Sequence, residues 1–110
     1  MKTYLIDEIS SADMKRVREE LTNRGLGSEL EDIFWVEMET GLLSETQLLH
    51  RQCAPHVFAI ELTPHSIRLE FLVRSLKDMR CSCNGVFTPH QIRFAMGYAD
   101  RLLDGLGVRT

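Results

Sequence analysis

Residues 57–73 read VFAIELTPHSIRLEFLV and contain the most informative pattern in this chain of 110 residues. Two apolar-rich stretches, residues 57–62 and 67–73, flank the four-residue connection TPHS at 63–66. Its proline suits the second position of a type I turn. The pattern predicts a β-hairpin, a unit of antiparallel sheet.

The pairing of Leu62 with Ile67 sets the register expected for this hairpin. One face would then carry the pairs Ile60 with Leu69, Phe58 with Phe71, and His56 with Val73. The other face would carry the pairs Glu61 with Arg68, Ala59 with Glu70, and Val57 with Leu72. The register was set from Leu62 and Ile67 alone, yet it also pairs Glu61 with Arg68, which have opposite charges, and the apolar Val57 with the apolar Leu72. These favourable pairs support the register.

Three helices are expected from their capping residues. Ser10 caps a helix that continues through Met14, Val17 and Leu21 to Gly25. Residues 44–47 (SETQ) and 88–91 (TPHQ) are capping-box patterns. The first opens a short helix that Pro55 must end, and the second opens a long amphipathic helix that Gly105 and Gly107 end.

Further strands are expected at residues 4–9, 33–38 and 79–83, where apolar, β-branched or alternating residues occur at strand length. The predicted order is β-α-β-short α-β-β-β-α. It indicates one α+β domain over residues 1–110, a two-layer sandwich with helices on one face of a mainly antiparallel sheet of about five strands. A ferredoxin-like βαββαβ variant is the alternative.

Composition limits the classes of partner. A net charge of -3 gives no basis for binding nucleic acid through phosphate neutralisation. No stretch approaches the apolar length of a membrane span, and the N-terminus has no apolar leader, so we expect no membrane association. Three cysteines, an odd number, agree with a reducing compartment, and we expect a cytoplasmic protein.

Cys81 and Cys83 are expected to be core residues, separate from the histidines. In a strand over residues 79–83, Cys81 and Cys83 would face the core as small apolar residues opposite Phe71 and Leu69. Cys81 would then lie about 12 Å from His56, too far to share a metal ion. The trio His50, Cys53 and His56 stays open as the alternative, a metal-binding or thiol-redox site.

No glycine-rich phosphate loop, G-x-S-x-G or HExxH motif is present in the sequence. We therefore expect a protein without catalytic residues and without a cofactor.

The function that the sequence favours is an interaction or regulatory domain. Several apolar residues are expected outside the core, where they would form an interface for a homodimer or a protein partner. On the sheet face away from the helices these are Ile33, Trp35, Val57 and Leu72, and on the last helix they are Phe94 and Tyr98.

Overall fold

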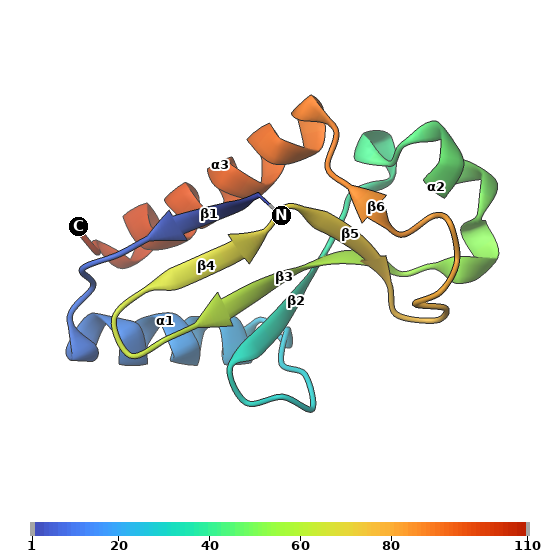
Figure 1. Cartoon of the computed structure of the whole chain (residues 1–110). Helices are drawn as coiled ribbons and strands as arrows, with labels where there is room; N and C mark the ends of the chain where they lie inside the picture. Colours follow the sequence, from blue (N-terminus) through green and yellow to red (C-terminus); the bar gives the residue numbers. More distant parts are fainter. Residues whose placement is uncertain (1, 110) are drawn as a thin grey trace.

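The computed structural model describes residues 2–109 and confirms the α+β class (Figure 1). In this part of the chain the sheet has six strands, in the order β1-β4-β3-β5-β6, with β2 also paired to β3. The strands are β1 (Thr3–Ile6), β2 (Ile33–Glu37), β3 (His56–Leu62), β4 (Ile67–Glu70), β5 (Leu72–Ser75) and β6 (Gly85–Val86). Strand β2 runs along one edge of β3, and β4 and β5 share its other edge.

Helices α1 (Ser11–Asn23) and α3 (Pro89–Leu106) cover one face of the sheet, as predicted (Figure 1). A short segment at one end of the sheet contains the 3₁₀ turn η1 (Thr40–Leu42), helix α2 (Glu45–Leu49) and the 3₁₀ turn η2 (Arg51–Cys53). This element order is not the βαββαβ order of the ferredoxin-like alternative. None of the helices in residues 2–109 is both long and apolar enough to span a bilayer.

The predicted helix caps form. The Ser10 hydroxyl accepts a hydrogen bond from the Asp13 amide at 3.1 Å, and both predicted capping boxes are present at α2 and α3. Gly107 ends α3 with a φ of 69°, a left-handed conformation that favours glycine. Gly105, expected to end the helix as well, lies within it.

The hairpin register is confirmed next to the turn and is wrong further out. Ile60 pairs with Leu69 and Leu62 with Ile67, but Val57 pairs with Arg74 rather than Leu72, a shift of two residues. His56 likewise pairs with Ser75 rather than Val73. An even shift keeps each side chain on its predicted face.

Phe71 is the reason for the shift, because its backbone bonds elsewhere. Its N–H donates to the Lys2 carbonyl at 3.1 Å, and its carbonyl accepts from the Phe87 N–H at 3.0 Å. The predicted single strand over residues 67–73 is therefore divided into β4 and β5 at this residue.

The strand predicted at residues 79–83 is wrong, because these residues belong to a loop between β5 and β6. The Asn84 side chain holds this loop: its amide nitrogen donates to the carbonyls of Asp78 (2.9 Å) and Cys81 (2.8 Å). Its amide oxygen accepts from the Ser75 N–H at 2.8 Å. These side-chain bonds satisfy backbone groups that strand pairing would otherwise satisfy, and they lead the chain from β5 into β6. We call residues 76–84 the cysteine loop.

The core lies between the sheet and the two long helices, with Phe58 of β3 at its centre. Phe58 is fully buried and meets the rings of Phe87, Phe94 and Tyr98 edge to face, with centroids 5.8 to 6.3 Å apart. Phe94 and Tyr98 are half-buried, and their rings pack against this core from helix α3.

We predict that Phe58→Ala lowers the free energy of unfolding by about 3 to 5 kcal/mol, because it leaves a cavity among three aromatic rings. Urea denaturation monitored by circular dichroism measures this change. The matched control is Leu49→Ala, whose side chain is 74% exposed and whose loss should change stability by less than about 0.5 kcal/mol. Equal effects of the two substitutions would contradict the assigned core.

Candidate functional site

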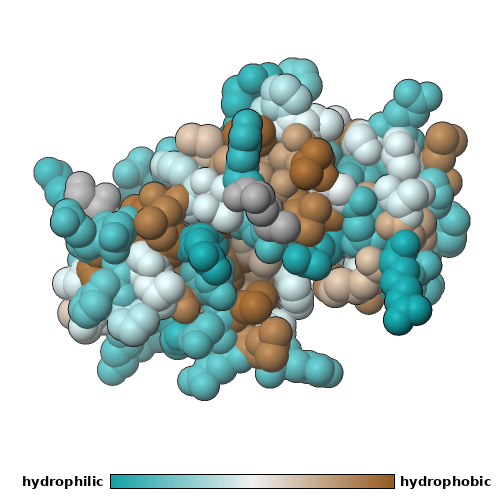
Figure 2. Space-filling model, viewed as in Figure 1, coloured by the Kyte–Doolittle hydropathy of each residue, from teal (hydrophilic) through white to brown (hydrophobic). Residues whose placement is uncertain are grey.

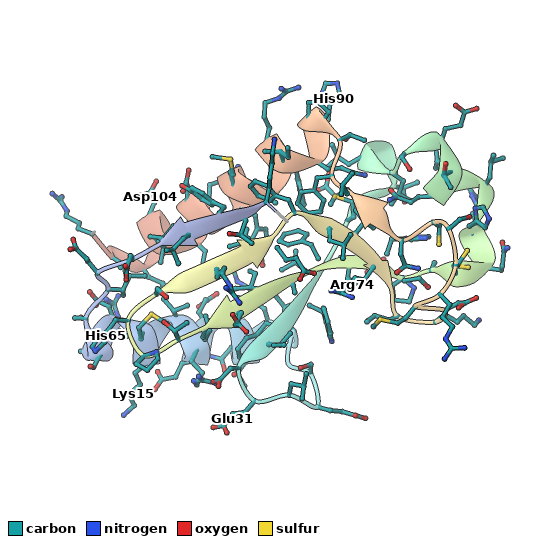
Figure 3. All side chains as sticks on the ribbon, in the orientation of Figure 1. Lys15, Glu31, His65, Arg74, His90 and Asp104 are labelled. Carbon is teal, nitrogen blue, oxygen red and sulfur yellow. The ribbon has the colours of Figure 1, made fainter. Side chains whose placement is uncertain are left out.

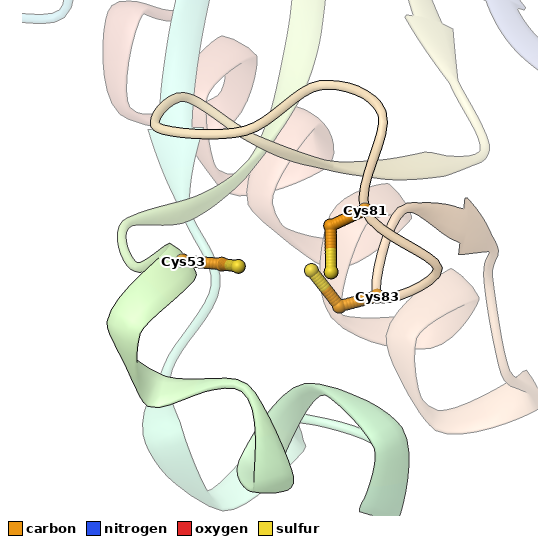
Figure 4. Close-up of side chains that lie close together, drawn as sticks. All are labelled: Cys53, Cys81 and Cys83. Carbon is orange, nitrogen blue, oxygen red and sulfur yellow. The ribbon is translucent and has the colours of Figure 1, made fainter.

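The three cysteines of the chain converge at one end of the sheet (Figure 4). Their sulfur atoms all lie within 4.8 Å of one another. Cys53 approaches from η2, and Cys81 and Cys83 approach from the cysteine loop. In Figure 4 the three side chains point toward a common centre. We call these residues the three-cysteine cluster.

Cys53 is held by the turn that precedes β3. Its N–H donates to the His50 carbonyl at 2.9 Å, and its carbonyl accepts from the buried Ser75 hydroxyl at 2.5 Å. The same hydroxyl accepts from the N–H groups of Lys77 (3.1 Å) and Asp78 (2.9 Å) at the start of the cysteine loop. One side chain thus fixes the positions of both segments that carry cysteines.

Cys83 is held through two buried glutamines that also cap helices. The Gln47 side-chain N–H group donates to the Cys83 carbonyl at 3.3 Å. The Gln47 side-chain oxygen accepts from Gln91 at 3.0 Å, and Gln91 also donates to the Leu42 carbonyl at 2.8 Å. Gln47 and Gln91 are 3% and 0% exposed, so these bonds form away from water. Helices α2 and α3 therefore both fix the cluster.

The three thiols have different environments. Cys53 and Cys83 are buried and Cys81 is half-buried. Burial raises the pKa of Cys53, and burial with hydrogen bonds from its neighbours raises the pKa of Cys83 to about 12. The backbone N–H of Cys83 bonds to the Cys81 sulfur and, with the Cys83 thiol, lowers the pKa of Cys81. Cys81 is accordingly the thiol most ready to ionise.

This donor set suits a thiophilic ion. Zinc binds thiolates at about 2.3 Å in a tetrahedron, which separates two ligand sulfurs by about 3.8 Å. The observed limit of 4.8 Å is about 1 Å longer, a difference that side-chain rotation closes. Three thiolates would leave one tetrahedral position for a fourth ligand. The same proximity also allows two of the thiols to form a disulfide after backbone adjustment.

The cluster differs from the sequence prediction. Cys81 and Cys83 were expected on a core strand, away from the histidines, but both lie in a loop that brings them close to Cys53. Cys83 is buried as expected, although it lies in a loop and not opposite Leu69. Asp78, Asn84 and Gly85 are frequent turn formers, and their positions around the cysteines could have indicated a loop.

The two histidines of the predicted trio have separate surroundings. The Nδ1 atom of His50 lies 2.6 Å from the Thr46 carbonyl at the end of α2. His56 is buried and lines a hollow with Met38, Leu43 and Gln47. Its Nε2 atom has no hydrogen-bond partner among the described residues. The three sulfurs form their group without a ring nitrogen of either histidine.

The remaining histidines lie elsewhere in the fold. His65 is in the turn between β3 and β4, and His90 is at the start of α3 (Figure 3). Each makes a local contact: His65 through Nδ1 with the Ile9 carbonyl at 3.0 Å, and His90 through Nδ1 with Arg93 at 2.8 Å. Neither belongs to the three-cysteine cluster.

The predicted interface residues divide into two groups. Ile33, Trp35 and Leu72 are half-buried. Phe94 and Tyr98 are half-buried too and pack on Phe58, whereas Val57 is only 3% exposed and offers little surface to a partner. The face viewed in Figure 2 carries hydrophobic residues in separate patches among hydrophilic ones.

Trp35 lines a groove that the sequence did not predict. Leu30, Leu76 and Met79 line it together with Trp35, and they are 59%, 39% and 50% exposed. Leu76 and Met79 belong to the cysteine loop, so the groove and the cluster share a segment of chain. We call this the Trp35 groove.

Comparison with protein-family models, with curated proteins and with solved structures finds no match for this chain.

We predict that Cys81 reacts first with iodoacetamide at neutral pH, at least about tenfold faster than Cys53 or Cys83, since it is the more exposed and more ionised thiol. Peptide mass spectrometry after timed quenching measures the three rates. Urea-unfolded protein is the control, and its three cysteines should react at similar rates. Preferential labelling of Cys83 in the folded protein would contradict the assigned environments.

We predict that His56 makes stability depend on pH. Burial and the nearby charge of His50 lower the pKa of His56. His56 therefore binds a proton less readily in the folded state than in the unfolded state, where it is protonated below about pH 6.5. Stability should therefore be full above about pH 6.5 and fall as the pH drops below it.

Urea unfolding at about pH 7.5 and about pH 5.5 measures this loss, and His56→Gln should reduce it. The control His90→Gln alters an exposed histidine and should leave the loss unchanged. An equal loss in wild type and His56→Gln would contradict the assignment.

Proposed function

We propose that this chain is a zinc-binding protein in which Cys53, Cys81 and Cys83 hold the ion. The observation that carries the proposal is the convergence of three sulfur atoms within 4.8 Å. Thiolates select zinc and other soft ions over magnesium or calcium, which prefer oxygen ligands.

The bonds around the cluster support a binding role over a packing role. Each of the two segments is fixed by buried side chains, through Ser75 at Cys53 and through Gln47 at Cys83. Ligands whose positions are already fixed by surrounding hydrogen bonds lose less conformational freedom when an ion binds. Cys81 is only half-buried, which leaves the ion a route of entry.

Zinc in this position would join the turn before β3 to the cysteine loop. The core around Phe58 contains neither segment and is complete without the cysteines. The ion would therefore order the end of the sheet, and the rest of the domain would fold without it. This differs from small zinc fingers, which are unfolded without metal.

We predict about one equivalent of zinc per chain in protein purified without chelator, measured by elemental analysis that also covers iron and copper. Cys53→Ser, Cys81→Ser and Cys83→Ser should each lower the content to less than about one fifth. Ser82→Ala is the matched control, since it alters the same loop without removing a sulfur.

A metal content below about one tenth of an equivalent in wild type, unchanged after dialysis against zinc, would contradict the proposal. Loss of two hydrogens per chain on isolation, reversed by a dithiol, would instead favour the thiol-redox alternative for the same cluster. Circular dichroism of the chelated protein should retain the wild-type spectrum.

A second candidate function is supported by the Trp35 groove: an interaction domain that forms a homodimer. Four exposed or half-buried apolar side chains share this groove, and exposed apolar surface of this kind marks association sites. Two copies of the groove brought together would bury Trp35 and Met79 against each other's apolar surface.

Sedimentation equilibrium at high micromolar concentration tests this candidate. We predict a dimer for wild type and a monomer for Met79→Glu, because a charge in an apolar interface is costly. The control Leu49→Glu places the same charge on an exposed apolar residue outside the groove. A wild-type monomer at every concentration would rule out self-association.

A further inference from the structure

His50 is the residue best placed to complete the three-cysteine cluster. It precedes η2, and its carbonyl accepts the hydrogen bond from the Cys53 N–H at 2.9 Å. Its side chain therefore begins one short turn before a ligand sulfur.

The contact made by the other ring nitrogen sets the chemistry of His50. Its Nδ1 atom lies 2.6 Å from the Thr46 carbonyl, which can only accept a hydrogen bond. Nδ1 must therefore carry the proton, and the lone pair of the neutral ring is on Nε2. A metal-ligating histidine almost always donates its other N–H to a carbonyl or carboxylate in this way.

We propose that His50 is the fourth zinc ligand and binds the ion through Nε2, giving a site of three thiolates and one imidazole. The inference rests on the proposed zinc-binding function and names the residue that closes its coordination shell. A closed shell of this type is typical of structural zinc sites.

Two rival ligands are less well suited. Asp78 precedes Cys81 by three residues, but one of its carboxylate oxygens already accepts from the Arg80 N–H at 3.1 Å. His56 has a free Nε2, yet its ring lines the separate hollow with Met38 and Leu43. Of the three, only His50 shares a turn with a cluster cysteine, through its backbone bond to Cys53, and also has a fixed tautomer.

Cobalt(II) spectroscopy of the full chain tests the inference. Cobalt substitutes for zinc, and the positions of its d–d bands distinguish three thiolates with one nitrogen from other ligand sets. We expect the wild-type spectrum to be that of a tetrahedral three-sulfur, one-nitrogen site. His50→Ala should shift the bands and weaken zinc binding at least about tenfold in a competition titration.

His50→Cys provides the rescue. A fourth thiolate can occupy the same position, so this variant should recover tight binding and raise the sulfur-to-cobalt charge-transfer absorbance from that of three thiolates toward that of four. If His50 served only to contact the Thr46 carbonyl, His50→Cys would show neither the recovered affinity nor the added charge-transfer absorbance. His90→Ala and Asp78→Asn are the matched controls and should bind like wild type.

The outcomes separate the two proposals. Wild-type spectrum and affinity in His50→Ala, with binding still lost in Cys81→Ser, would overturn the role of His50 and leave the zinc site standing. A spectral change in Asp78→Asn but not in His50→Ala would assign the fourth position to Asp78 and overturn the inference. Absence of cobalt and zinc binding in wild type would overturn both.

Discussion

Burial of one face of β3 is the interaction on which the other elements depend. Phe58, Ile60 and Leu62 of this strand face the helix layer and are at most 3% exposed. β2 occupies one edge of β3, and β4 and β5 divide the other. Every strand except β1 and β6 therefore pairs with β3, and both long helices contribute to the same core. The three-cysteine cluster forms beside the N-terminal end of β3, where the chain enters this strand from η2.

The hydrogen bond between Gln47 and Gln91 joins this core to the cluster. Each glutamine completes the capping box of its own helix, and the side chain then has donors to spare for another element. Gln91 uses its donors on Leu42 and Gln47, and Gln47 donates to Cys83. Helix capping and site positioning are thus done by the same buried amides. A substitution that looks neutral for the cap, such as glutamate for Gln47, would remove a donor from the Cys83 carbonyl and bury a charge.

Local patterns predicted most of the fold. The caps at Ser10, Ser44 and Thr88 act within one turn of helix, and the hairpin turn fixes the pairing of its nearest residues, so sequence alone was sufficient. The division of β4 and β5 was not predictable in this way, because it depends on Phe71 bonding to Lys2 and Phe87, which are distant in the sequence. The same limit applied to the cysteines. Alternation at residues 79–83 is compatible with a strand. The hydrogen bonds from Ser75 to Asn84 and to Cys53, which hold these residues in a loop beside Cys53, join segments that the alternation does not connect.

The cysteine loop has two surfaces with different chemistry. Its final residues contribute two sulfurs to the cluster, and its first residues contribute Leu76 and Met79 to the Trp35 groove. The loop is nine residues long and is tied at both ends through Ser75 and Asn84, so we expect a change at the sulfurs to alter the packing of Leu76 and Met79. Trp35 is the single tryptophan of the chain, so its fluorescence is an intrinsic reporter on that movement. We therefore expect Trp35 fluorescence to respond to the state of the sulfurs, without a label on any cysteine.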